Sequence, residues 1–292
     1  MISILALAAF PLFQTPAKPD RLKPLVPAPE GYTPKATPAP KPAAVPEDSP
    51  FRSLGPTPQP QRGALPTPST KGPRDQKDGR PLPFSEDRPL LSIDGAVIRA
   101  GELNQLVSYY RSYRSGSDDM MLQAAVKALL PVKVMQAKFK AQLPDMYRNI
   151  EEAHEAAVAG EDFASVVKRF SQDSEAPTDD GRYTFGRDQA VQPFDRICHS
   201  TPVNGFSAPF LTVYGYHFLQ VLDYQRGEKP KDDQSTSRHV LIMFPEMVQM
   251  EKEGKDVRSW IKQQVQAAKI EVLEAGMQNL VPPANRGQIT GQ

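Results

Sequence analysis

A chain of 292 residues with a formal net charge of +1 gives no overall electrostatic case for binding nucleic acid or an anionic membrane. Of its 31 prolines, 21 fall in the first 90 residues. Proline removes backbone donors and disrupts helix interiors, so this third of the chain cannot build a packed core. We therefore expect the folded part to span about residues 90 to 285. That length is enough for one hydrophobic core, or for one core with a second, smaller core beside it.

The single cysteine, Cys198, excludes an intramolecular disulfide. The usual structural zinc sites use at least two cysteines, so one Cys and four His nearly exclude such a site. We expect neither a metal nor a cofactor. Cys198 follows the apolar Ile197, and we interpret it as a small buried hydrophobic residue.

Residues 1–13, MISILALAAFPLF, are apolar but too short to span a bilayer. They resemble the apolar core of a secretory signal, which predicts an extracytoplasmic protein, periplasmic or secreted, with tethering to a membrane or cell wall through this end. The alternatives are a frayed apolar terminus or a misassigned start, because no Lys or Arg precedes the run. Residues 14–89 are a proline-rich linker that we expect to be disordered and to favour polyproline II.

Residues 90–150 are expected to form a helical region introduced by a hairpin. Two short apolar runs flank Asp94-Gly95, which is a strong hairpin signal. The spacing of apolar residues at i, i+3, i+4 and i+7 then predicts helices. Their expected ranges, separated by Pro131 and Pro144, are Leu103–Tyr110, Asp118–Leu130, Val132–Leu143 and Asp145–Val158. The tyrosines and methionines of these helices either form core or offer an adaptable surface to apolar partners.

Residues 160–224 read as a mixed α/β unit. A helix with an apolar face is expected from Glu161 to Phe170, followed by a turn-rich loop. A short strand over Tyr183–Phe185 and a short helix over Pro193–His199 come next. Alternation over Val213–Tyr224 predicts a strand with His217, Leu219, Val221 and Asp223 on one face.

Three segments of this unit, GEDFASVVKRFSQD, GRDQAVQPF and LTVYGYHFLQVLD, resemble the parvulin-type peptidyl-prolyl isomerase domain over about Glu151 to Asp223. The resemblance implies an α+β fold in which residues 151–244 form a small antiparallel sheet flanked by helices. Residues 90–143 are more weakly similar to the N-terminal helical region of exported chaperone-isomerases. Residues 245–284, a helix and a strand, are expected to close on that region, so that the N- and C-terminal segments form a mostly helical collar.

Parvulins normally begin with a strand that carries a His-Ile-Leu motif, and nothing before Gly160 supplies it. The candidate is the alternating run SRHVLI, so residues 237–244 are expected to return beside Val213–Tyr224 as a permuted strand. The alternative is that this strand pairs elsewhere, as an edge strand of the helical region. In the first arrangement, the resemblance implies that His217 and His239 meet below the active cleft.

The resemblance also implies the remaining site residues. Asp173 stands at the family's Cys-or-Asp position and Thr212 at its threonine near the histidines, so the expected catalytic residues are Asp173, His217, His239 and Thr212. An apolar wall that receives the proline ring is expected from Phe185, Ala190 and Phe194. No covalent bond is made or broken in this reaction, and an apolar pocket favours the twisted amide by differential binding.

The chain departs from the family pattern at two places. The usual Gly-Gly-Asp-Leu-Gly is replaced by residues Asp179–Tyr183, and the pocket methionine is replaced by Ala190. We expect His154 at the surface. His199 matches no catalytic position of the family, and we expect it to be a surface or a capping histidine. Asp179, Asp180 and Asp188 are expected in solvated loops. The segment beyond Pro282 is expected to be a tail.

These features predict an exported peptidyl-prolyl isomerase that helps other proteins fold. The expected partners are unfolded or extended proline-containing polypeptides. The alternative is a weak or inactive parvulin-fold chaperone that holds extended chains in the same groove and against the helical collar. A third interpretation, a wall-associated structural protein, rests only on the proline-rich linker.

Overall fold

The computed structural model describes residues 72–73, 81–173, 176 and 178–290. The expected signal segment and most of the expected linker therefore lie outside the described residues. The fold is α+β, as predicted, with two four-stranded sheets and helices packed against them. Among the described residues, no helix is both long enough and apolar enough to cross a membrane.

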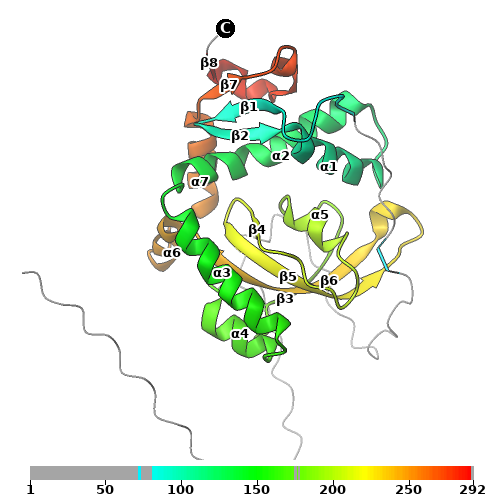
Figure 1. Cartoon of the computed structure of the whole chain (residues 1–292), viewed down its shortest axis with the longest axis vertical. Helices are drawn as coiled ribbons and strands as arrows, with labels where there is room; N and C mark the ends of the chain where they lie inside the picture. The colour runs from blue at the N-terminus through cyan, green and yellow to red at the C-terminus, as the bar shows by residue number, and fades with distance from the viewer. Residues whose placement is uncertain (1–71, 74–80, 174–175, 177, 291–292) are drawn as a thin grey trace, which may run out of the picture. The chain divides into compact units, whose positions relative to one another are not determined.

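The first sheet, in the order β2-β1-β7-β8, joins the two ends of the folded region (Figure 1). Strands β1 (Pro89–Ile93) and β2 (Ala96–Arg99) form the expected hairpin, in which Asp94 and Gly95 have φ angles of 48° and 91°. Strand β7 (Ile270–Val272) pairs antiparallel with β1. The expectation of a tail beyond Pro282 is wrong, because 3-10 helices η3 (Met277–Leu280) and η4 (Pro283–Gln288) lead to β8 (Ile289–Thr290), which pairs parallel with β7.

Helices α1 (Ala100–Arg111) and α2 (Asp118–Lys138) follow the hairpin. The Ser117 side chain accepts a hydrogen bond from the Met120 backbone and so begins α2. The expected break at Pro131 is wrong, since α2 continues through it. A proline inside a helix costs about 3 kcal/mol, and here burial of the residues around it, Leu129, Leu130, Val132 and Val134, opposes that cost.

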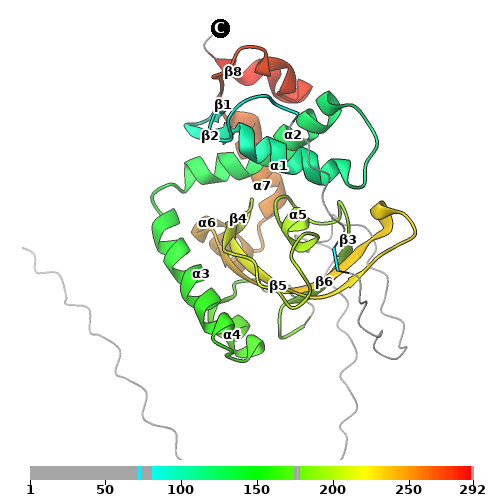
Figure 2. The ribbon, with the colours of Figure 1, turned by 45° about the vertical axis from the view of Figure 1, so that its right-hand side comes forward.

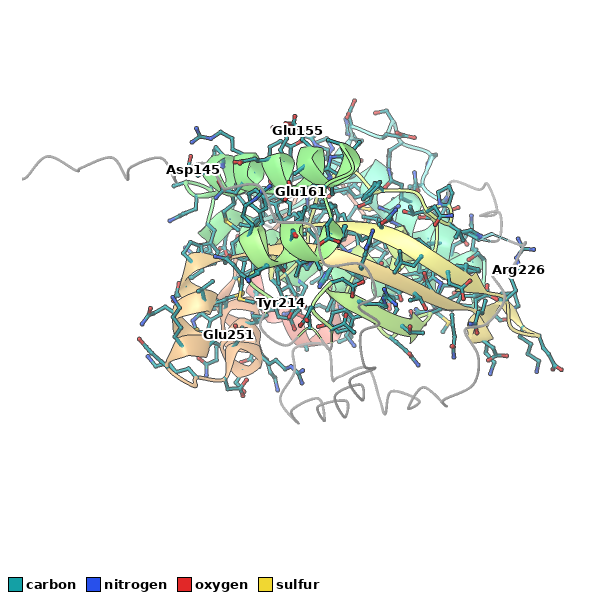
Figure 3. All side chains as sticks on the ribbon, turned by 90° about the horizontal axis from the view of Figure 1, so that it is seen from below. Asp145, Glu155, Glu161, Tyr214, Arg226 and Glu251 are labelled. Carbon is teal, nitrogen blue, oxygen red and sulfur yellow. The ribbon has the colours of Figure 1, made fainter. Side chains whose placement is uncertain are left out.

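The second sheet, in the order β3-β6-β5-β4, is covered on one face by α3 (Leu143–Val158) and α4 (Phe163–Phe170). In Figure 3, Asp145 and Glu155 mark α3, and Glu161 precedes α4. The expected division between residues 150 and 151 falls inside α3, which packs along β5 and β6. His154 is half-buried rather than solvated, because its ring stands edge-on to Phe218 at 5.2 Å.

The strands of this sheet are β3 (Arg182–Gly186), β4 (Phe210–Leu211), β5 (Gly215–Gln225) and β6 (Gln234–Met243). Strand β6 pairs antiparallel with both β5 and β3. A bulge between Val221 and Asp223 shifts the register of β5. Beyond that bulge Tyr224 is buried and Asp223 only half-buried, whereas simple alternation had placed Asp223 on the face of His217.

Helix α5 (Phe194–Cys198) lies on the other face of the second sheet, between that sheet and α1 (Figures 1 and 2). After β6, helices α6 (Pro245–Lys252) and α7 (Val257–Ala267) return the chain to α2. The rings of Phe139 and Phe244 stack with their centres 4.5 Å apart and so hold the end of α2 against the start of α6. The N- and C-terminal segments thus pack on each other around the residues between them.

A buried ion pair anchors α1 to the second sheet. The Arg187 guanidinium donates to the Asp233 carboxylate at 3.2 Å and to the Tyr224 hydroxyl at 3.0 Å, and both charged side chains are at most 2 % exposed. The same guanidinium donates to the Ser112 hydroxyl and lies 5.2 Å from the ring centre of Tyr109. One side chain therefore joins α1 to the β5–β6 hairpin.

Replacing Asp233 with Ala leaves the Arg187 charge buried and without its carboxylate. We expect the free energy of unfolding to fall by about 3–5 kcal/mol, measured by urea denaturation. The matched control is Asp145→Ala, which removes an ion pair to Arg148 in which both side chains are more than 70 % exposed. That variant should lose less than about 1 kcal/mol, and equal losses in the two variants would contradict the role given to the buried pair.

Candidate functional site

Two histidines meet on the central strands of the second sheet. His217 lies on β5 and His239 on β6, and the register sets them diagonally across the pair. Their Nδ1 atoms are 3.3 Å apart, and their rings stack with centres 5.3 Å apart. Both residues are at most 1 % exposed. The contact thus depends on β6, which returns beside β5 from later in the chain.

The histidine pair continues into a hydrogen-bonded chain at both ends. The Asp173 Oδ2 atom is 2.9 Å from Nε2 of His239, and the Thr212 Oγ1 atom is 2.8 Å from Nε2 of His217. Thr212 in turn accepts a hydrogen bond from the Tyr214 backbone amide. The four residues form one polar line, which we call the histidine network: Asp173, His239, His217 and Thr212.

An arrangement with neutral rings is compatible with the three contacts along this line when Asp173 is ionised. His239 then donates from Nε2 to the carboxylate and accepts at Nδ1 from His217, whose Nε2 accepts from the Thr212 hydroxyl. Both rings are neutral in this arrangement. Burial, and then the neighbouring His239, lower the pKa of His217 well below its usual value, which agrees with a neutral ring.

Aromatic side chains enclose the histidine network. The Phe194 ring stands edge-on to both histidines, at 5.4 Å from His217 and 5.2 Å from His239. Phe210 stacks on His217 at 5.7 Å, and Phe185 contacts Phe194 at 5.8 Å. Ala190 belongs to the same apolar cluster. Phe194 is 1 % exposed and Ala190 is 9 % exposed. Neighbouring side chains therefore cover the apolar wall that was expected to receive the proline ring.

The structure brings together all seven site residues named from the sequence: four in the histidine network and three in the apolar cluster. Sequence reasoning missed Phe210 and Tyr183. Tyr183 donates its hydroxyl to Oδ2 of Asp173 at 2.9 Å and stands edge-on to the His239 ring at 5.3 Å. Its position two residues before Phe185 on the same strand was the available signal, because alternate residues of a strand share a face.

Comparison with known proteins identifies a family for one segment of the chain. Residues 129–223 match the family described as the PPIC-type PPIase domain, or rotamase. The chain carries a parvulin-type domain. The match ends at Asp223, so β6 and its His239 lie beyond the matched residues of the parvulin domain. No solved structure gave a significant match.

Curated relatives are similar to part of the chain. "Chaperone SurA" of Pseudomonas fluorescens (strain Pf0-1) is 28 % identical over 164 residues, which is 54 % of this chain and 35 % of the relative. "Foldase protein PrsA 3" of Bacillus anthracis is 27 % identical over 122 residues, 39 % of this chain and 43 % of the relative. "Foldase protein PrsA" of Geobacillus sp. (strain WCH70) is 30 % identical over 42 % of each chain. The chain thus spans less than half the length of these relatives.

A second buried polar cluster lies where the parvulin domain meets α1. Asp195 on α5 is fully buried and accepts hydrogen bonds from the Tyr109 hydroxyl at 2.6 Å and from Gln192 at 3.2 Å. Nearby, Asp188 accepts from Tyr113 and pairs with Arg114. The tyrosine face of α1 is therefore occupied by the parvulin domain rather than free for partners. Asp188 is exposed in a turn, as expected, and it also bonds to two side chains at the end of α1.

His199 belongs to this second cluster, and it stands at the C-cap of α5, which was one of its two expected places; the other expectation, at the surface, is wrong. The residue is 1 % exposed, and its ring stands edge-on to Tyr224 and Phe185. Neither ring nitrogen makes a hydrogen bond of normal geometry, although the Gly186 backbone partly favours the charged form. Its Nε2 atom is 4.0 Å from Oδ1 of Asp195. The short α5 helix turns the ring inward, which sequence spacing alone did not reveal.

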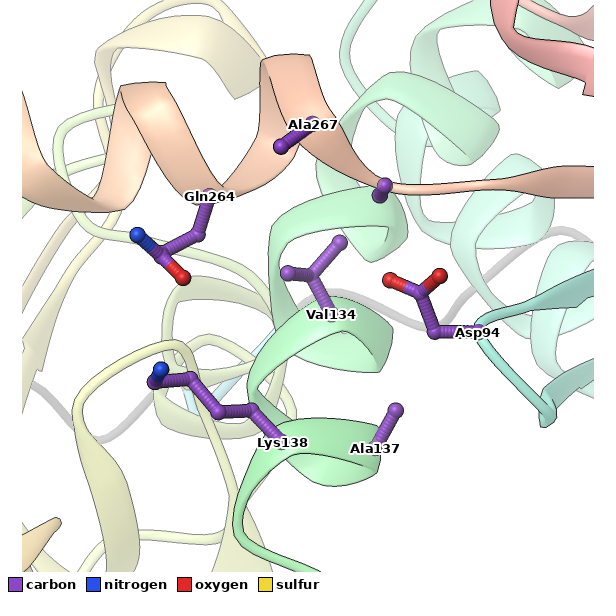
Figure 4. Close-up of a pocket in the computed structure, with 7 residues that line it drawn as sticks. Asp94, Val134, Ala137, Lys138, Gln264 and Ala267 are labelled. Carbon is purple, nitrogen blue, oxygen red and sulfur yellow. The ribbon is translucent and has the colours of Figure 1, made fainter.

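Two of the hollows on the surface of the described residues bear on the site. One, of about 280 Å³, lies between the helices α1 and α2 and the segments that carry Pro193, Leu211 and Tyr216, and its lining also includes Leu106 and Leu129. The other lies between α2, α7 and the hairpin turn, where Asp94, Lys138 and Gln264 surround Val134 (Figure 4). The second hollow shares no lining residue with the histidine network, whereas Pro193 and Leu211 of the first adjoin Phe194 and Phe210.

The second cluster has two opposing effects on stability. Burial raises the pKa of Asp195 to about 7, so below that pH the folded protein keeps a proton that the unfolded chain releases near pH 4. Its contribution is full below about pH 4 and is lost as the pH rises through 7. Burial, and then Arg187, lower the pKa of His199 to about 3. Its contribution is full above about pH 6.5 and is lost as the pH falls.

Single substitutions should separate these two effects, which oppose each other between about pH 4 and 6.5. In Asp195→Asn only the effect of His199 titration on stability remains, so the free energy of unfolding should rise with pH by up to about 1.4 kcal/mol per pH unit. In His199→Phe only the effect of Asp195 titration remains, so the free energy of unfolding should fall as the pH rises. Urea denaturation at several pH values measures both. Identical pH profiles for the two variants would contradict the assignment.

Proposed function

We propose that the chain is a peptidyl-prolyl cis–trans isomerase that assists the folding of exported proteins. The observation that carries this proposal is the unbroken hydrogen-bonded line from Asp173 through His239 and His217 to Thr212, set against the Phe194 ring. The family match and the similarity to a foldase and a chaperone support it. The proposed substrates are unfolded or extended polypeptides that contain proline.

The proposed mechanism needs no covalent step. The barrier to rotation is the amide resonance of the X-Pro bond, and a twisted amide has lost that resonance and its charge separation. An apolar wall made by Phe194 and Phe185 would bind the twisted form better than the planar, more polar ground state. The histidine network would hold the floor of the pocket rigid, because each of its members is fixed by a partner at both sides.

We also propose that the catalytic unit comprises residues 151–244, with residues 237–244 of β6 as a permuted strand. The pairing of β6 with β5 and the end of the family match at Asp223 support β6 as a strand added from beyond the matched residues, and the match itself begins at residue 129, inside α2. Export is the proposed route to an extracytoplasmic location, and it rests on the apolar residues 1–13. Tethering through that end is part of the same proposal.

The alternative is a weak or inactive parvulin-fold chaperone that binds extended chains. The burial of Phe194, at 1 % exposed, favours it, because a prolyl ring cannot reach this wall without movement of its neighbours. The hollow between the parvulin domain and the helices α1 and α2 offers apolar and polar side chains to an extended chain. The two candidates differ in whether X-Pro exchange is accelerated.

The wild-type chain should accelerate cis–trans exchange of a short Ala-Pro peptide, measured by exchange NMR. Phe194→Ala should lower kcat/KM at least about tenfold, because truncating the ring removes the wall that contacts both histidines. Phe139→Ala is the matched control, since Phe139 is buried against Phe244 outside the site. It should change kcat/KM by less than about twofold while folded, as checked by circular dichroism.

The absence of any acceleration by the wild-type protein would contradict the isomerase proposal. Suppression of the aggregation of an unfolded model protein, retained by both wild type and Phe194→Ala, would then support the chaperone alternative. Acceleration retained in full by Phe194→Ala would instead show that catalysis does not use this wall.

A further inference from the structure

Tyr183 is a half-buried aromatic residue that contacts both parts of the proposed site. It lies on the edge strand β3, and its ring packs against the apolar cluster that contains Ala190 and Phe194. Its hydroxyl donates to Oδ2 of Asp173 at 2.9 Å, the same oxygen that lies 2.9 Å from His239. The side chain thus bridges the apolar wall and the histidine network.

The burial of the neighbouring groups indicates which of them can meet a peptide. The side chains of Asp173 and His239 are 2 % and 1 % exposed, and Phe194 is 1 % exposed. Tyr183 retains access to solvent while its hydroxyl reaches the carboxylate. A prolyl ring that reaches Phe194 from this side, once the neighbouring side chains have moved, therefore lies against the Tyr183 ring. An exposed peptide group would meet the phenol oxygen before the carboxylate behind it.

The sizes of two residues in the cluster are complementary. Ala190 contributes a single methyl group, whereas Tyr183 contributes a full phenol ring to the same apolar cluster. Interiors are close-packed, so a large side chain can compensate for a small one in the same cluster. Both positions are also places where this chain departs from the pattern described above.

We propose that Tyr183 is a substrate-binding residue of this site. Its ring supplies the apolar surface of the prolyl pocket that the small Ala190 side chain does not provide. Its hydroxyl, held by Asp173, is the polar group presented to the bound peptide. Asp173 is then a positioning residue that acts through Tyr183 and His239. This inference rests on the proposed function for the location of the pocket, but it concerns peptide binding and can be tested without catalysis.

The test measures the dissociation constant of an Ala-Pro-containing tetrapeptide by NMR titration of the full chain, alongside kcat and KM from exchange NMR. Tyr183→Gly should weaken binding about tenfold, because the ring wall is lost. Adding Ala190→Met to that variant should restore binding to within about threefold of wild type, because the larger side chain returns volume to the same apolar cluster. Tyr183→Phe keeps the ring, so the dissociation constant should change less than about threefold while kcat falls.

Thr184→Gly is the matched control, since it introduces glycine at the next position of the same strand, where the side chain is exposed and bonds to Thr236. It should leave the dissociation constant unchanged. If Tyr183→Gly does not fold, as judged by circular dichroism, Tyr183→Leu replaces it and should bind about threefold more weakly than wild type, with the same restoration by Ala190→Met.

The outcomes separate this inference from the proposed function. A wild type that binds the peptide without accelerating exchange contradicts the isomerase proposal, while the dissociation constants of the variants still decide the role of Tyr183. Equal affinity of wild type and Tyr183→Gly overturns the inference, as does failure of Ala190→Met to restore binding. A wild type that does not bind the peptide overturns both.

Discussion

The antiparallel pairing of β5 with β6 is the constraint on which the site depends. It fixes His217 diagonally opposite His239, and the remaining contacts of the histidine network follow from that pairing. A shift of one residue would turn His239 to the opposite face, toward α3 and α4, because side chains alternate along a strand. Register is specified here by burial, since Leu219, Val221, Val240 and Leu241 are all at most 1 % exposed.

The parvulin domain and the helical segments are held together by polar as well as apolar contacts. Arg187 reaches from the domain to α1 and to the β5–β6 hairpin, and Asp195 accepts the Tyr109 hydroxyl from α1. Such buried polar groups stabilise little on their own, but they allow few alternative arrangements because each wrong one leaves a charge or hydroxyl without a partner. They therefore fix how α1 lies against α5.

Several features could be read from the sequence because a local rule governs each of them. Asp94-Gly95 specifies its hairpin by turn chemistry, and the apolar face of α4 follows from helical spacing. The seven site residues could be named because their motifs resemble those of a family, and the structure brings them together. Their catalytic and binding roles remain predictions.

Other features depended on packing that no local rule encodes. Pro131 stays inside α2 because tertiary burial outweighs its propensity, and the bulge after Val221 changes which residue faces inward. His199 was read as a surface or a capping residue, yet it is buried by Tyr224 and Phe185, which come from other parts of the chain. Tyr183 escaped attention because its partner, Asp173, lies in a loop ten residues earlier.

The pairing of β1 with β7 also constrains the order in which the protein can form. The backbone of Lys269 bonds to Asp94 across 175 positions of sequence, and the second histidine arrives only with β6. Contacts between such distant positions form slowly, because a long loop must close before they are gained. During synthesis, a chain that has not yet reached β6 holds one histidine of the pair and an unpaired β5 edge. The site can therefore assemble only after most of the folded region has been made.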